Sequence, residues 1–174
     1  MALFDFLILF LIYILFCLKK WKQQGNDVLL SRTLMYIYLS FVLYFTLMPI
    51  ISELPFIFSH PYEPMHLVPF DDILKGYGDC VREVILNVIM TVPFGILFPI
   101  TQVEKKRTFL RTVIATFLLS LSIELIQPLI SGFHKSDITD LITNTTGCII
   151  GYLFYILFKS VISKLFLHIK HRKT

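Results

Sequence analysis

The segment SDITDLITNTTGCIIGYLFYILF, residues 136–158, decides the fold. Its second half is apolar enough to enter a lipid bilayer, yet its first half carries Asp137, Asp140 and Asn144. Residues three or four apart share one face of a helix, so these three side chains lie on one stripe. The segment therefore predicts a membrane helix whose outer end is acidic on one side.

The rest of the chain is also rich in apolar residues. Of 174 residues, 56% are hydrophobic and 16% are charged, whereas soluble domains carry about 25% charged residues. Spanning helices need about 17–25 mostly apolar residues, and five segments fit: 2–18, 33–51, 84–100, 108–130 and 138–158. The first has Asp5 where a signal peptide carries basic residues, which favours a retained helix. We predict an all-α membrane protein, a five-helix transmembrane bundle.

Basic residues predict the orientation of this bundle. In a five-span arrangement, 13 of the 16 Lys and Arg residues fall on one side, and this side is cytoplasmic under the positive-inside rule. The N-terminus is then outside and the C-terminus is in the cytoplasm. The basic, amphipathic tail 159–174 either lies on the inner leaflet or extends the last helix.

Two further segments carry polar stripes like that of 136–158. In segment 108–130, Ser120, Glu124 and Gln127 share a face. Around the start of segment 84–100, Asn87 follows Glu83 by four residues and shares a face with it. All three stripes are richest near the outer side, so we predict a shared pocket that opens outward. Its residues are Arg82, Glu83, Asn87, Glu124, Gln127, His134, Asp137, Asp140 and Asn144.

The pocket residues have distinct expected roles. Glu124 is the deepest acid and needs a partner, since a charge at mid-membrane costs about 2.5–3.5 kcal/mol. Arg82, His134 and Lys135 are the candidate cations. Glu124 and Asp140 are candidate acid–base groups, and whether any reaction is catalysed stays open. No cofactor is expected, although the carboxylates leave a divalent metal open. The alternative is that the cluster only bridges helices.

Small residues and proline on the same segments predict helix packing. Glycines four residues apart allow close approach of a second helix, and Pro93 removes one helical hydrogen bond. The predicted packing positions are Pro93, Gly95, Gly147 and Gly151. The Pro-rich loop 52–81 could cap the pocket, and its His60 and His66, without an evident partner, are assigned to headgroup depth.

Four stretches resemble the VanZ-like family of membrane proteins. HLVPFDDI is similar to the family's N-L-x-P-F loop, with His66 where Asn is usual. VREVILNVIMTVPFGILFP matches its Arg-Glu, Asn and Pro-x-Gly pattern, SLSIELIQ its S-x-x-x-E-x-x-Q pattern, and SDITDLITNTTGCIIGY its D-I-x-D-x-x-x-N-x-x-G-x-x-x-G pattern. Many members have Arg where this chain has His134. The predicted domains are 1–31, a first helix and basic loop; 32–158, the VanZ-like four-helix domain; and the tail.

The resemblance implies a bacterial plasma-membrane protein associated with tolerance to the glycopeptide antibiotic teicoplanin. The expected partners are the lipid bilayer and either the antibiotic or a cell-wall precursor, with no nucleic acid. Three routes stay open: altering surface lipids or polymers, competing for the drug's site, or modifying a precursor. The alternative is an enzyme acting on lipid-linked or polyprenyl-phosphate envelope substrates. A transporter is disfavoured because the chain shows no inverted repeat.

Overall fold

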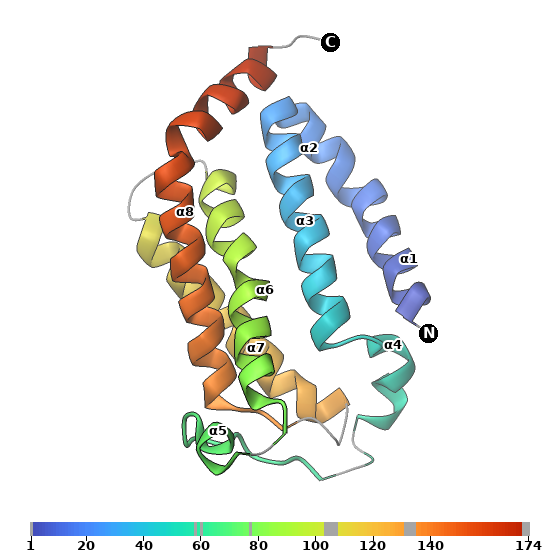
Figure 1. Ribbon diagram of the computed structural model, residues 1–174. Coiled ribbons are helices and arrows are strands. Elements are labelled where there is room, and N and C mark those ends of the chain that lie inside the picture. Colours follow the sequence, from blue (N-terminus) through green and yellow to red (C-terminus); the bar gives the residue numbers. More distant parts are fainter. Residues whose placement is uncertain are drawn as a thin grey trace.

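The computed structural model describes residues 2–57, 59, 61–76, 78–102, 108–130 and 135–171, which form a bundle of helices (Figure 1). In chain order the elements are α1 (Ala2–Ile12), the π-helix η1 (Tyr13–Leu18), α2 (Lys19–Gln24), α3 (Asn26–Thr46), α4 (Ile50–Glu53), the 3-10 helix η2 (Leu54–Phe56), α5 (Asp71–Lys75), α6 (Cys80–Thr101), α7 (Thr108–Ile130) and α8 (Ile138–His171).

Four helices, α3, α6, α7 and α8, are long and apolar enough to cross a membrane. This confirms the prediction of an all-helical membrane protein in its coarser form. The predicted first span is helical too, but η1 interrupts it and α1 has only 11 residues. The count of five spans and the orientation of the termini stay predictions.

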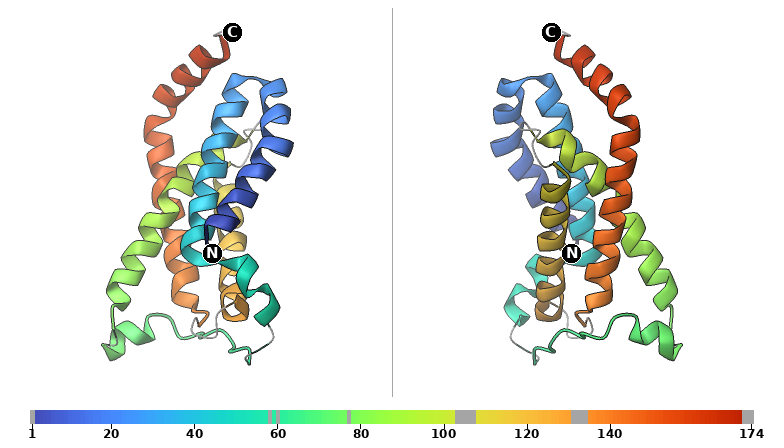
Figure 2. Two further views of the ribbon diagram at one scale, coloured as in Figure 1. Left: turned by 90° about the vertical axis from the view of Figure 1, so that its right-hand side faces the viewer. Right: turned by 90° about the vertical axis from the view of Figure 1, so that its left-hand side faces the viewer.

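The first helical run folds back against α3. Gly25, with φ of 127°, makes the turn between α2 and α3. The Tyr36 hydroxyl donates to the Leu9 carbonyl at 2.7 Å, and the hydroxyls of Tyr13 and Thr33 are 2.9 Å apart. The run 2–24 therefore forms an antiparallel hairpin with α3, which both views of Figure 2 show in blue.

The closest packing in the bundle joins α6 and α8. A Cβ atom on Gly151 would lie 2.0 Å from the Val92 carbonyl oxygen, and one on Gly147 would lie 2.2 Å from that of Val88. Gly95, two residues after Pro93 within α6, faces the Cys148 carbonyl in the same way, at 2.1 Å. We call these contacts the glycine seam. Hydrogen is the only side chain that fits there, so the two backbones touch.

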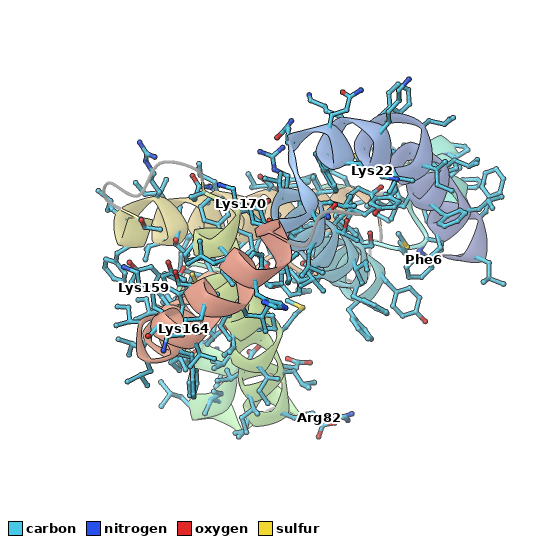
Figure 3. The ribbon with its side chains drawn as sticks, turned by 90° about the horizontal axis from the view of Figure 1, so that it is seen from above. Phe6, Lys22, Arg82, Lys159, Lys164 and Lys170 are labelled. Atoms are coloured by element: carbon cyan, nitrogen blue, oxygen red, sulfur yellow. The ribbon has the colours of Figure 1, made fainter. Side chains whose placement is uncertain are left out.

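α8 continues past residue 158 without a break. Its 34 residues span about 50 Å at 1.5 Å per residue, against about 30 Å for a bilayer core. The tail to His171 thus extends the last membrane helix, and it rises beyond the other helices in Figure 1. Lys159, Lys164 and Lys170 lie along this extension in Figure 3.

The two ends of the bundle differ in composition. One end, here called the loop end, comprises α4, α5, the starts of α6 and α8 and the end of α7 (Figure 1). The start of α6 lies beside α5 at its edge (Figure 2). The opposite, basic end holds the turn between α2 and α3 with its lysines, and the extension of α8.

Candidate functional site

The site is built where the loop 65–70 docks on the start of α8. The His66 backbone N–H donates to the Ser136 carbonyl at 2.8 Å, and the Ile138 N–H donates to the His66 carbonyl at 3.0 Å. These two bonds make an isolated parallel bridge between His66 and Asp137. One turn further on, the Phe70 N–H donates to the Thr139 hydroxyl at 2.9 Å. The loop is thus fixed by its backbone and its residues follow the first turn of α8.

Asp137 links α8 to α7. Its side chain accepts the Thr139 N–H at 2.7 Å, as an N-terminal helix cap does. Its own N–H donates to the Glu124 carboxylate at 3.1 Å, and the Ser136 hydroxyl donates to the Glu124 carbonyl. Glu124 is only 2% exposed. This buried acid therefore satisfies the backbone at the point where the chain enters α8.

Asn87 joins α6 to the same place. Its amide nitrogen donates to Asp140 at 2.6 Å. One turn deeper, the Asn144 amide donates to the Ser120 hydroxyl at 2.9 Å, whereas the Asn144 carbonyl oxygen is buried without a hydrogen-bond partner among the described residues. Two amides thus connect α6 and α7 with the polar stripe of α8.

A small cavity opens between these elements and the loop. Its volume is about 30 Å³, which holds water-sized groups, whereas drug-sized sites are about 300–1,000 Å³. The lining residues are Phe70, Asp72, Ile73, Cys80, Glu83, Val84, Asp137, Thr139 and Asp140. We call Glu83, Glu124, Asp137 and Asp140 the acidic cluster. In this conformation the cluster can take a small donor group but not a whole antibiotic.

The structure separates several predicted pocket residues from this cluster. Gln127 donates to the Thr46 carbonyl of α3 at 3.1 Å, so its amide faces away from α8. Arg82 lies 3.7 Å from Asp79 and is 74% exposed, because the start of α6 stands at the edge of the bundle. Lys135 pairs with Glu63 at 3.1 Å.

The predicted partnership of Glu124 with Arg82 or Lys135 is therefore not formed. Glu124 instead accepts a hydrogen bond from the Asp137 backbone N–H. The buried carboxylate therefore has a donor without a cationic side chain beside it. The third candidate cation, His134, lies outside the described residues, as does His60.

Two residues with a clear part in this region were missed by the sequence reasoning. The His66 imidazole lies 3.4 Å from Asp71 and 3.7 Å from Asp137, so the expectation that it has no partner is wrong. Its place at headgroup depth stays a prediction. Asp71 also pairs with Lys75, and this hydrogen bond raises the pKa of Lys75. The position of His66 five and six residues before the acids Asp71 and Asp72 was the available signal.

The second missed residue is Asp5 in α1. It is 5% exposed and accepts the backbone N–H groups of Ile50 and Ile51 at 3.0 and 3.3 Å. A carboxylate at the first turn of a helix satisfies donors that the helix itself leaves free. Asp5 thereby ties the first helix to α4.

The described residues contain no group of three His, Cys, Asp or Glu side chains placed to hold a metal ion. Three acids of the cluster, Glu124, Asp137 and Asp140, instead accept hydrogen bonds from the fold. Taken together, the four apolar helices, the glycine seam and the docked loop define a class: a small helical membrane protein with an acidic cluster at one end.

Comparison with known proteins gives the family within this class. The VanZ/LLP1 family matches residues 33–159, and the chain belongs to that family. It is similar to Protein VanZ of Enterococcus faecium, with 34% identity over 127 residues that cover 73% of this chain and 74% of that protein. No solved structure matches. The matched region contains the glycine seam, the acidic cluster and the docked loop, and it excludes α1 and Asp5.

Proposed function

We propose that this protein acts at the outer face of a bacterial plasma membrane and raises tolerance to teicoplanin through its acidic cluster. The observation that carries the proposal is the docking of loop 65–70 on the start of α8. It places the loop motif, Glu124 of α7 and Asn87 of α6 around Asp137 and Asp140. The VanZ-like motifs thus converge on one point of the molecule.

The distribution of charge supports the outer-face orientation. The lysines of α2 and of the α8 extension lie at the end opposite the loop end, which holds the acidic cluster (Figure 1). A cytoplasmic basic end leaves the loop end outside. The apolar part of the antiparallel run, residues 2–18, has about 25 Å of helical length, at the short end of what a fifth span needs, and such a span would put the N-terminus outside.

The chemistry of the cluster supports a ligand that donates hydrogen bonds or carries positive charge. Carboxylates accept such bonds strongly, and the cavity beside Asp140 admits a group of water size. An ammonium or amide group of a cell-wall precursor, or of the antibiotic, fits this description. We propose no cofactor.

The proposal assigns no chemical reaction to the cluster. Both candidate acid–base groups serve the fold: Glu124 accepts the Asp137 N–H, and Asp140 accepts the Asn87 amide. The action that these contacts support best is binding at the membrane surface, by which the protein would shield or alter the drug's target.

The test is the teicoplanin concentration that inhibits a sensitive Gram-positive host. The strains carry an empty vector, the wild type, Asp140→Asn, or Glu63→Gln as a control, all at matched membrane abundance. Glu63 is an acid of the same side that pairs with Lys135 outside the cluster. Protection by the wild type and by Glu63→Gln, with most of it lost in Asp140→Asn, is expected. Equal protection by all three proteins would contradict the role of the cluster, and no protection would contradict the function.

A further inference from the structure

A second hollow lies on the outward side of the start of α6. It is a groove of about 400 Å³ lined by Gly78, Asp79, Val81, Arg82, Ile85 and Leu86. In Figure 3 the Arg82 side chain points away from the bundle, so the mouth of the groove faces away from the other helices. It is separate from the acidic cluster, which lies between α6, α7 and α8.

The groove combines a charged mouth with an apolar wall. Arg82 and Asp79 lie 3.7 Å apart at the mouth and are 74% and 77% exposed. The wall below them consists of Val81, Ile85 and Leu86, each more than half exposed, and Ile89 continues it one turn further along α6. This arrangement of charges above an apolar strip matches the shape of a phospholipid.

We propose that this groove binds one membrane phospholipid whose headgroup carries both a phosphate and a primary ammonium. The Arg82 guanidinium suits the phosphate, because its donors match phosphate oxygens. The Asp79 carboxylate suits the ammonium, and the acyl chains lie along Ile85 and Ile89. The inference does not depend on the proposed function.

The charges at the mouth select among headgroups. A purely anionic headgroup meets the carboxylate of Asp79, which lines the same groove as Arg82. A choline headgroup has no N–H to donate to Asp79, whereas an ethanolamine ammonium has three donors. Phosphatidylethanolamine is therefore the probe with full charge complementarity.

Quenching of tryptophan fluorescence by brominated lipids tests this selection in vesicles. The only tryptophan, Trp21, lies in α2, so Trp21→Phe provides a silent background. Ile89→Trp reports on the groove. Leu118 in α7 is 55% exposed, so Leu118→Trp reports on an ordinary lipid-facing site. Brominated phosphatidylethanolamine, phosphatidylcholine and phosphatidylglycerol are each diluted into the same unbrominated lipid.

The groove reporter is expected to favour phosphatidylethanolamine over the other two lipids by about threefold, a modest ratio because exposed ion pairs are weak. The α7 reporter is expected to show a ratio of about one. Arg82→Gln and Asp79→Asn should each abolish the preference while leaving the α7 reporter unchanged. Equal quenching by all lipids at the groove, a preference for phosphatidylglycerol, or a preference that survives both substitutions would overturn the proposal.

Discussion

The pair α6 and α8 is held together in two different ways along its length. In the glycine seam the two backbones touch because Gly95, Gly147 and Gly151 lack side chains. At the loop end the same helices are joined by a polar bond from Asn87 to Asp140. The seam depends on shape alone, whereas the loop end depends on partners from α7 and from a loop some 70 residues away in the chain.

This difference predicts that the seam tolerates change least. Substitution of Gly151 by Ala would place a Cβ 2.0 Å from the Val92 carbonyl, and neither backbone can move without opening the helix pair. Overpacking of this kind costs about 1–3 kcal/mol and sometimes more. We expect a lower thermal unfolding midpoint in detergent and less protein in the membrane.

Ile150→Ala is the control for the seam. Ile150 is the neighbouring residue and is partly exposed on the outer side of α8, so its truncation should leave the midpoint close to that of the wild type. An unchanged midpoint for Gly151→Ala would mean that α6 and α8 do not approach as closely as the seam requires.

Glu124 tests the buried contact at the loop end. Glu124→Ala leaves the Asp137 N–H without its acceptor, at a cost of about 1–3 kcal/mol for a buried donor. Glu124→Gln keeps an oxygen in that place and should recover most of the unfolding free energy, measured by denaturant titration. A Gln variant as unstable as the Ala variant would show that α8 needs the negative charge and not the acceptor.

The glycines of the seam and the acidic stripe could be predicted from the sequence because each set follows the periodicity of its own helix. Steps of three and four residues put Asp140, Asn144, Gly147 and Gly151 on one face, and that face does contact α6 and α7 in the structure. Helical periodicity indicates which side of a helix is polar, independently of which element packs against that side.

The partners themselves could not be predicted in this way. Gln127 shares the stripe of Glu124 but contacts the end of α3, since a long amide can reach a neighbouring helix on either side. Arg82 was one of the candidate cations, yet the start of α6 stands at the edge of the bundle and Arg82 is largely exposed. The contacts of His66 and Asp5 depend on how distant segments meet, which periodicity does not encode.

Asp5 extends the comparison to the first helix, outside the matched family region. Asp5→Ala removes the acceptor for two backbone N–H groups of α4, and we expect a loss of about 1 kcal/mol. In a background that lacks Cys17 and Cys80, the cysteine of a Glu53→Cys variant should also react faster with a thiol reagent when Asp5 is replaced by Ala than when Asp5 is present. Asp27→Ala is the control, because Asp27 is an acid at the opposite end of the hairpin. Equal labelling in the Asp5→Ala and Asp27→Ala variants would show that Asp5 does not hold α4 in place.

His66 should give the smallest effect and the sharpest distinction. Its imidazole is 39% exposed and lies 3.4 and 3.7 Å from its acidic neighbours. His66→Asn introduces the residue that is usual in the VanZ-like loop, and it should change the unfolding free energy by less than about 0.5 kcal/mol. His66→Pro instead removes the N–H that bonds to the Ser136 carbonyl at 2.8 Å, and its cost should approach that of Glu124→Ala. If unfolding free energies rank the Asn variant with the Pro variant, the imidazole holds the loop. If they rank the Asn variant with the wild type, the loop is held by its backbone. The loop end is then stabilised by backbone hydrogen bonds, whereas the seam is stabilised by close contact at residues without side chains.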